Sequence, residues 1–341
     1  MQNGADAASP RYIFCKASAA AMKLFSGKDT LRLRSEEGVE VEPYAMAPAL
    51  PIILLNGGVG IATGFSSDVP TYKPTEVLRN VRRFLEGDEF EEMAPYYPHF
   101  TGTVTEAGPK RWRVEGVFAM SGDVVTVSEA PVGKAFTKMA DGYKSAESPV
   151  TLLEDRSSEA RPSFKLKFKS AETLAEAQKK GVAETLGLVK YVSTANMNLF
   201  DAAGRLRKFA STSEILGDWC AWRLGVYVER KASLLAASAA ERDKMEDRHR
   251  YVSAVVERRI DLAGVDEAAL VAHLRADGYR TVDGSYDFLL NMPNRAFTTD
   301  RCAKSLADLQ KHRAAHEKLA ATAPRDMWRE DLDAVEPLLI A

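Results

Sequence analysis

The sequence is poor in cysteine and histidine, and it has no long hydrophobic run. Its 341 residues include three cysteines and five histidines. Three cysteines spread over positions 15, 220 and 302 cannot build a disulfide framework or a cysteine metal cluster, and they suit a reducing compartment. No apolar stretch approaches the roughly 18 residues of a transmembrane helix. We therefore predict neither a membrane span nor a cysteine-based metal site.

An excess of charge of one sign is also absent. The net charge is −2, which gives no overall indication of a nucleic-acid partner. The first residues, MQNGADAASPRY, have no apolar core, so they do not read as a signal peptide. With 45% hydrophobic and 28% charged residues, the composition is that of an ordinary globular protein. The length allows two or three domains, each with its own core.

Basic residues are nevertheless concentrated in two segments. Local clusters of this kind can contact phosphate groups whatever the total charge, but they can equally be solvated faces. Composition alone leaves both interpretations open. The clusters are Arg11, Lys16, Lys23, Lys28, Arg32 and Arg34 in the first segment, and Lys110, Arg111, Arg113, Lys134, Lys138 and Lys144 in the second.

A glycine-rich stretch, PIILLNGGVGIATGFSSDVP (Pro51–Pro70), looks like a strand leading into a phosphate-binding loop. A dinucleotide fingerprint would need glycine at position 63, where threonine stands, and a P-loop would need lysine after Gly64, where Phe65 stands. Pro70 also follows too soon for these glycines to open a helix. The pattern favours a buried strand and a tight turn over a nucleotide loop. It leaves the apolar Ile61 on that turn to be explained.

The segment up to about residue 205 reads as a mixed α/β block. Ser170 is expected to be the N-cap of a helix that runs to Lys180, with Gly181 at the C′ position. A further helix is predicted over Glu76–Leu85. The alternation of apolar and polar residues predicts short strands at Trp112–Val117, Val124–Ser128 and Phe164–Lys169.

After Thr212 the apolar residues recur at helical spacing. The pattern predicts a helix over Ser213–Ile260, which would span roughly 70 Å at 1.5 Å per residue, too long for an ordinary core helix. A second periodic segment, Cys302–Leu319, can pack back on it antiparallel as a coiled-coil-like arm. Residues 261–299 between them are expected to form a small helical cap.

One motif near the start carries chemistry. GADAASPRYIF (Gly4–Phe14) closely resembles the active-site tyrosine loop of the eukaryotic and viral branch of type IIA DNA topoisomerases, with Ala5 in place of the family's lysine. Five further blocks are similar to that family in the same order, so the resemblance covers nearly the whole chain. These blocks are Val41–Tyr72, Met93–Val104, Asn198–Phe209, Tyr286–Pro293 and Pro324–Glu336.

The resemblance implies a role for each matching residue. Tyr12 would be the nucleophile that forms a 5′-phosphotyrosine link, and Arg11 would hold a non-bridging phosphate oxygen. Ile61 would insert between base pairs and bend the duplex, at an unstacking cost of a few kcal/mol. At Lys134 the family usually has an Arg-Thr-Trp segment, which leaves a DNA contact there open. The basic residues expected to contact DNA are Lys16, Lys110, Arg111 and Lys134.

The fold class implied by the family is mixed α/β plus α. Residues 1–44 would be the C-terminal part of a winged-helix domain, 45–208 an α/β tower domain, and 209–341 a long coiled-coil arm with a helical C-gate. The chain would bind double-stranded DNA and form a homodimer through its C-terminal arm. The expected location is the nucleus, or a viral replication compartment or the cytoplasm if the chain is viral.

The family's cofactors, Mg²⁺ and ATP, are bound by Toprim and ATPase regions that lie upstream of the tyrosine motif. We therefore expect no metal or ATP site in this sequence, which looks like a fragment or one polypeptide of a split enzyme. The D-x-D spacing at Asp331 and Asp333 matches the family's terminal helix rather than a metal site. An alternative function is a catalytically incomplete module that bends DNA and dimerises.

Overall fold

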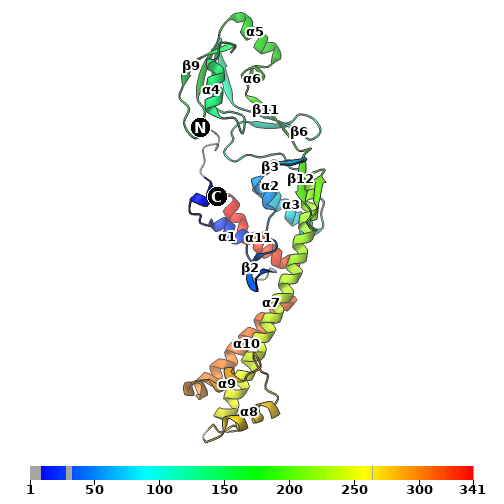
Figure 1. Cartoon of the computed structure of the whole chain (residues 1–341), viewed down its shortest axis with the longest axis vertical. Coiled ribbons are helices and arrows are strands. Elements are labelled where there is room, and N and C mark those ends of the chain that lie inside the picture. The colour runs from blue at the N-terminus through cyan, green and yellow to red at the C-terminus, as the bar shows by residue number, and fades with distance from the viewer. Residues whose placement is uncertain (1–8, 28–32, 263, 341) are drawn as a thin grey trace. The chain divides into compact units, whose positions relative to one another are not determined.

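The structure, a computed structural model, describes residues 9–27, 33–262 and 264–340 (Figure 1). The first half of the tyrosine motif, with Ala5, and the basic residues Lys28 and Arg32 lie outside the described residues. The chain divides into two compact units. Unit 1 comprises Met1–Ser26, Pro48–Arg223 and Asp331–Ala341, and unit 2 comprises Gly27–Ala47 and Leu224–Glu330.

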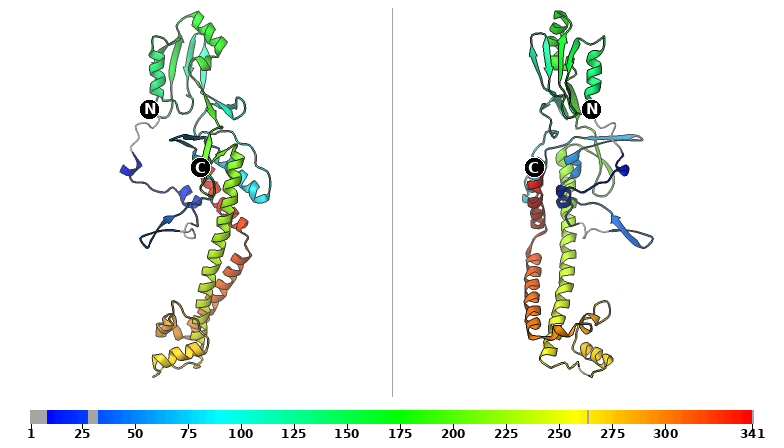
Figure 2. Two further views of the ribbon diagram at one scale, coloured as in Figure 1. Left: turned by 45° about the vertical axis from the view of Figure 1, so that its right-hand side comes forward. Right: turned by 90° about the vertical axis from the view of Figure 1, so that its left-hand side faces the viewer.

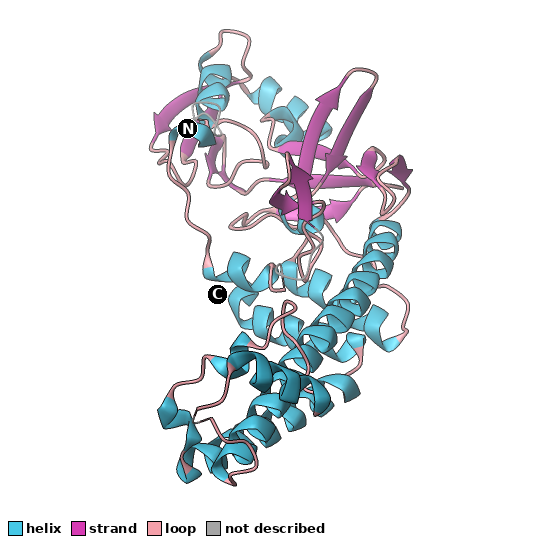
Figure 3. Cartoon of the chain, turned by 60° about the horizontal axis from the view of Figure 1, so that its bottom comes forward, coloured by secondary structure: helices cyan, strands magenta, loops and turns pink. Residues whose placement is uncertain are grey.

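The strands of unit 1 pair as small antiparallel sheets, drawn in magenta in Figure 3. Their orders are β7-β8-β10-β9, β11-β6-β5, β12-β13 and β3-β4. The strands are β3 (Gly58–Ala62), β4 (Phe65–Val69), β5 (Thr103–Glu106), β6 (Arg111–Glu115), β7 (Phe118–Ser121), β8 (Val124–Val127), β9 (Val150–Asp155), β10 (Phe164–Phe168), β11 (Val189–Ser193), β12 (Met197–Phe200) and β13 (Leu206–Phe209). The helices are η1 (Pro10–Tyr12), α1 (Ala19–Leu24), α2 (Ile52–Asn56), α3 (Pro74–Glu86), α4 (Phe136–Lys144), α5 (Ala171–Lys180), α6 (Val182–Thr185) and the start of α7 (Thr212–Val256).

The main core of unit 1 lies on one face of the four-stranded sheet. Strand β10 alternates buried and exposed side chains, so Phe164, Leu166 and Phe168 point into the core. Helix α4 packs against β9 (Figure 1), and its Tyr143 meets Phe164 edge to face with ring centroids 5.5 Å apart. The three strands predicted from alternation correspond to β6, β8 and β10, each within two residues at either end.

The predicted cap of α5 is confirmed. The Ser170 hydroxyl accepts a hydrogen bond from the Thr173 backbone N–H, and the Thr173 side chain accepts one from the Ser170 N–H. This reciprocal pair is a capping box, which satisfies two donors at the helix N-terminus. Gly181 follows the last residue with a φ of 104°, a conformation that favours glycine.

The prediction of a buried strand within Pro51–Leu55 is wrong. Residues Ile52–Asn56 form the short helix α2, Gly57 caps it, and the next glycines, from Gly58 to Gly64, lie in the β3–β4 hairpin. A five-residue apolar run is too short for periodicity to separate a helix turn from a buried strand. The helical turn lets the fully buried Leu54 accept a hydrogen bond at its carbonyl from the Tyr72 N–H, at 2.8 Å.

Helix α3 joins the end of the chain to unit 1. It spans Pro74–Glu86 and contains the predicted Glu76–Leu85 segment. Its Arg82 guanidinium pairs with Asp333 at 2.7 Å and with Glu336 at 2.8 Å, both on α11 (Pro324–Ile340). The D-x-D carboxylate at position 333 is therefore an ion-pair partner.

Unit 2 is mainly helical. The long helix α7 continues into it, and this part of α7 lies beside α10 (Thr299–Ala321) (Figure 2). Helix α7 ends at Val256 rather than at the predicted Ile260, because Arg258 has a φ of 57° and the Arg259 N–H bonds back to the Ala254 carbonyl. None of the described helices is long and apolar enough to cross a membrane. The other elements are β1 (Leu33–Glu36), β2 (Val39–Pro43), α8 (Glu267–Ala276), α9 (Asp287–Leu290), η3 (Asn294–Phe297), α10 (Thr299–Ala321) and the start of α11.

The predicted antiparallel packing of α7 and α10 is confirmed by side-chain contacts. As the residue number on α7 increases, the number of its partner on α10 decreases. Small polar and charged groups therefore fix the register of the pair, in addition to apolar packing. The contacts are Lys231 to the Ala320 carbonyl, Ser238 to His316, Glu246 to Arg313, His249 to Ser305 and Ser253 to Cys302.

The cap predicted at 261–299 is helical and has its own core. Tyr251, Leu274 and Leu289 are buried in it. Arg280 attaches the segment after α8 to α7, because its backbone N–H and its guanidinium both reach the buried Asp247, at 3.0 and 3.1 Å. A buried carboxylate needs such partners, so the cap and α7 form one packed body.

Candidate functional site

The tyrosine motif forms a tight turn that exposes its phenol. Residues Pro10–Tyr12 make a single 3₁₀ turn, closed by the Tyr12 N–H on the Ser9 carbonyl at 3.0 Å. The Tyr12 side chain is 72% exposed, although tyrosine is usually half-buried. Proline fixes the backbone at the start of the turn, so the turn is set by local sequence.

Arg11 folds over Tyr12. Its Nη2 donates a hydrogen bond to the Tyr12 Oη at 3.1 Å, and its Nη1 donates to the Ser9 Oγ at 3.1 Å. The guanidinium carbon lies 4.6 Å from the centroid of the Tyr12 ring. The remaining guanidinium donors can reach an anionic partner.

The residues after Tyr12 are unusually exposed for their type. Ile13 is 56% exposed and Phe14 is fully exposed, followed by the exposed Cys15 and Lys16. Adjacent exposed apolar side chains are a feature that interaction surfaces share. The predicted contact residue Lys16 lies at the edge of this surface.

Ile61 lies on β3 of the glycine hairpin and is 91% exposed. It pairs in register with Ser66 of β4. Val59, two residues earlier, points to the same face of the strand and is 78% exposed. The hairpin therefore presents two neighbouring apolar side chains, of which sequence reasoning singled out only one.

Two asparagines that the sequence analysis missed hold this hairpin. The Asn198 Nδ2 donates to the Ser66 carbonyl at 2.7 Å, and the Asn196 Nδ2 donates to the Ser66 Oγ at 2.8 Å. The Asn196 carbonyl also accepts from the Asp68 N–H at 2.8 Å. Strand β4 is thus anchored to β12 (Figure 1), while β3 presents Ile61. The available signal was an Asn-x-Asn pair at the start of a strand, a type of element in which asparagine is normally depleted.

The same segment anchors the basic turn at Lys110 and Arg111. The Thr194 N–H donates to the Lys110 carbonyl at 2.9 Å, two residues before Asn196. The exposed Arg111 guanidinium lies 3.9 Å from the centroid of the Tyr191 ring, which orients it. Residues 194–198 therefore connect the hairpin that carries Ile61 to this basic turn.

Lys134 lies in a different environment. Its Nζ donates to the Gly187 carbonyl at 2.6 Å, and the side chain is only partly exposed. Burial, and then repulsion from Lys190, lower the pKa of the Lys134 ammonium. The structure brings Arg11 and Tyr12 together and joins Ile61 to Lys110 and Arg111. Lys134 instead cross-links two protein segments.

A metal centre is not among these features. Within residues 9–27, 33–262 and 264–340, no group of three or more His, Cys, Asp and Glu side chains is arranged to hold a metal ion. Two-metal phosphoryl transfer needs a carboxylate cluster, so the residues described do not fit Mg²⁺.

Comparison with known proteins identifies the family. Residues 1–333 match the DNA gyrase/topoisomerase IV A-subunit family. The chain is 27% identical to DNA topoisomerase 2 of Penicillium chrysogenum over 98% of its own length and 23% of that protein's. It is 28% identical to DNA topoisomerase 2-alpha of Mus musculus, covering 97% of this chain and 25% of the relative.

A solved structure shares the fold. The topoisomerase II DNA-binding, cleavage and re-ligation domain of Plasmodium falciparum superposes with a TM-score of 0.87 at 26% identity, over 99% of this chain and 50% of that one. The chain spans about a quarter of the length of the curated relatives. The resemblance inferred from the sequence motifs is confirmed. The chain belongs to the DNA gyrase/topoisomerase IV A-subunit family.

Proposed function

We propose that this chain is the breakage–reunion part of an ATP-dependent type IIA DNA topoisomerase, an isomerase that cuts one duplex, passes a second through it and religates the first. The observation that carries the proposal is the exposed Tyr12 phenol held by the Arg11 guanidinium. Family membership supports it, as does the P. falciparum relative, which is described as a DNA-binding, cleavage and re-ligation domain.

The chemistry would begin when the Tyr12 Oη attacks a backbone phosphorus. The new Oη–P bond forms as the bond from phosphorus to the 3′ oxygen breaks, and the phenol proton leaves while the 3′ oxygen gains one. The product is a 5′-phosphotyrosine ester and a free 3′-hydroxyl. Because an ester replaces an ester, the 3′-hydroxyl can reverse the step and reseal the strand. Arg11 would offset the charge that develops on the phosphate oxygens.

Ile61 would be the wedge that enters the base stack and bends the duplex. Its 91% exposure on an anchored hairpin supports this role, since a wedge needs a rigid base and a free tip. Lys16, Lys110 and Arg111 are exposed cations that would contact phosphates. Lys134 also remains a proposed DNA contact, with its amine already engaged by the Gly187 carbonyl.

The proposed organisation follows the family. Residues 1–44 would complete a winged-helix domain, 45–208 would form the tower, and 209–341 would form the coiled-coil arm and C-gate. The antiparallel α7–α10 pair and the helical cap beyond it support an arm that dimerises. Two-fold symmetry would then supply two copies of Tyr12, one for each strand of a duplex.

The whole enzyme would use Mg²⁺ and ATP. As the family resemblance implies, the Mg²⁺ ions would be bound by an upstream Toprim region, and ATP by an upstream ATPase region. That upstream region is the second proposed partner, besides double-stranded DNA. The eukaryotic topoisomerase 2 relatives favour a nuclear location, with a viral replication compartment or the cytoplasm as the alternative.

The rival function is a module that bends DNA and dimerises without catalysis. A trapping experiment separates the two. The chain is combined with the ATPase–Toprim region of a related topoisomerase 2, Mg²⁺ and supercoiled plasmid, and the reaction is stopped with denaturant. We expect a covalent protein–DNA adduct that is lost in Tyr12→Phe and retained in Tyr44→Phe, a matched exposed tyrosine. An adduct that survives Tyr12→Phe would refute the nucleophile, and no adduct with any upstream partner would favour the rival.

A further inference from the structure

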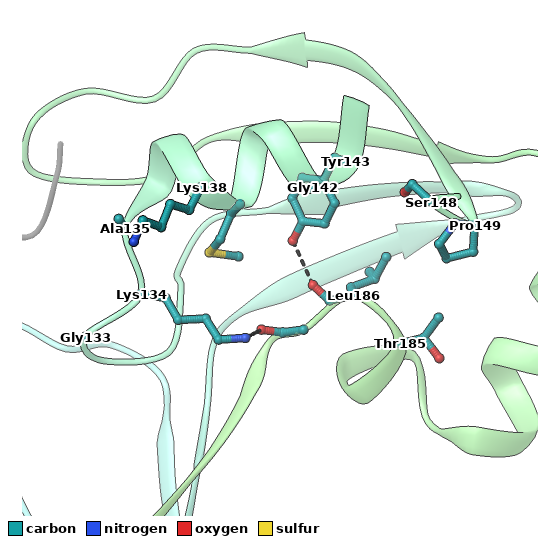
Figure 4. Close-up of a pocket in the computed structure, with 12 residues that line it drawn as sticks. Gly133, Lys134, Ala135, Lys138, Gly142, Tyr143, Ser148, Pro149, Thr185 and Leu186 are labelled. Atoms are coloured by element: carbon teal, nitrogen blue, oxygen red, sulfur yellow. Dashed lines mark hydrogen bonds between the residues drawn. The ribbon is translucent and has the colours of Figure 1, made fainter. Parts of the chain in front are cut away.

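Unit 1 contains a pocket of about 670 Å³ in which Lys134 is the one lining residue that the proposed function also uses (Figure 4). It lies between helix α4 and the turn that joins α6 to β11. Its volume falls in the range of small-molecule sites, which is about 300–1,000 Å³. The residues that give it chemical character are Lys134, Lys138, Tyr143, Ser148, Thr185 and Leu186.

One end of the pocket is positively charged. Lys134 and Lys138 both lie in the left half of Figure 4, and the described residues that line the pocket include no Asp or Glu. The Lys134 Nζ has one protein acceptor, the Gly187 carbonyl, so an ammonium with three N–H donors keeps two for another acceptor. Lys190 lies close behind, with its Nζ 3.1 Å from the Val132 carbonyl.

This concentration of positive charge is electrostatically costly. Burial, and then the charge of Lys190, lower the pKa of Lys134. An anion bound beside Lys134 would offset both effects. The pocket therefore complements a negatively charged group in charge as well as in hydrogen-bond donors.

The middle of the pocket is apolar. The Tyr143 hydroxyl is already used, because it donates to the Leu186 carbonyl at 2.9 Å (Figure 4). The ring of Tyr143 and the Leu186 side chain therefore offer carbon surface to a ligand. At the other end lie Ser148 and Thr185. The Ser148 Oγ accepts from the Val150 N–H, which leaves its own O–H free to donate to a ligand.

We propose that this pocket binds a small amphipathic anion, with a phosphate or carboxylate group at Lys134 and Lys138 and an apolar body against Tyr143 and Leu186. The charge pattern and the apolar wall are both needed, so neither a neutral aromatic molecule nor a bare inorganic ion fits fully. The site is independent of DNA cleavage, and its test needs no catalytic activity.

The test uses the whole chain with methionine methyl groups labelled with ¹³C. Met139 lines the pocket, so its methyl resonance reports on occupancy. Titration with 1-naphthyl phosphate should shift this resonance in a saturable way. 1-Naphthol, which keeps the ring and lacks the charge, and inorganic phosphate, which lacks the ring, should each bind at least about tenfold more weakly.

Three variants keep the proposal falsifiable. Lys138→Gln removes one charge from an exposed position and should weaken naphthyl phosphate binding about fivefold or more, while Lys165→Gln, on the exposed face of β10, should not. Gly142→Leu should block the pocket. Gly142 lies within α4, where a Cβ built on it meets nothing within 4 Å, and an unchanged melting temperature of the variant would show that the fold is kept.

Three outcomes would overturn the proposal. The first is equal affinity for 1-naphthol and naphthyl phosphate, and the second is unchanged binding in both Lys138→Gln and Gly142→Leu. The third is complete displacement of naphthyl phosphate by short duplex DNA, which would make these lysines part of a DNA-binding surface instead.

Discussion

Substitution of Gly57 tests whether the backbone conformation of the glycine-rich stretch requires glycine. It stands between α2 and the hairpin that carries Ile61, with φ 65° and ψ −177°. This region of backbone space is essentially restricted to glycine, and another residue there costs of order 1–3 kcal/mol. A Cβ on Gly57 would also lie 2.8 Å from the Val69 carbonyl oxygen and 3.2 Å from the Thr71 nitrogen. Both neighbours are backbone atoms, so they cannot move aside cheaply.

We therefore expect Gly57→Ala to destabilise the base of the hairpin by about 2 kcal/mol or more, with the clash adding to the backbone strain. Gly60→Ala is the matched control. Gly60 lies in the same hairpin without a positive φ, and a Cβ built on it meets nothing within 4 Å. Its substitution should change stability by less than about 0.5 kcal/mol.

Hydrogen exchange measures the difference locally. A loss of about 2 kcal/mol corresponds to about 30-fold faster exchange of the amides in β3 and β4, if they exchange through opening of the hairpin. Gly60→Ala should exchange at nearly the parent rate. Equal exchange rates in the two variants would refute the argument, because they would mean that the conformation of Gly57 imposes no requirement for glycine.

Three further outcomes are expected. Ile61→Ala should reduce DNA bending, measured by fluorescence transfer between duplex ends, and should cost little stability because the side chain is exposed. Unchanged bending together with a lower melting temperature would contradict the role of Ile61 as a wedge. Sedimentation of the whole chain should show a dimer. The double substitution Leu262→Asp and Val265→Asp, at two exposed apolar positions of the cap, should convert it to a monomer. A dimer that persists in this variant would place the contact elsewhere. Hydrogen bonding from Arg280 lowers the pKa of Glu246 below its ordinary value of 4.5. The Glu246 carboxylate therefore stabilises the fold at pH values above 4.5, and this stabilisation is lost as the pH falls through the lowered pKa. Because Glu246 is about one-third exposed, acid titration of unfolding should show a difference of about 1 kcal/mol or less, and a Glu246→Gln variant with the same acid sensitivity as the parent would contradict it.

The sequence by itself determined the features that depend on neighbouring residues. The cap at Ser170 and the helices on either side of the 261–299 cap were predicted correctly in kind, and the 3₁₀ turn at Arg11 and Tyr12 is likewise set by its own residues. Such features depend on a proline, a hydroxyl at the N-terminus of a helix or a periodic apolar face, which lie within a few residues of one another. Family membership could likewise be inferred from the sequence, because six segments of the chain resemble segments of the family in the same order.

Only the tertiary structure decided the features that depend on distant residues. The apolar run after Pro51 forms a helix whose Leu54 carbonyl accepts from the Tyr72 N–H, and periodicity over five residues cannot show such a contact. Lys134 and Arg111 look alike in the sequence. Lys134 is partly buried against Gly187 and Arg111 is exposed on Tyr191, because segments from separate parts of the chain meet at each of them. The charge of a side chain is encoded locally, but the partner that it meets depends on non-local packing.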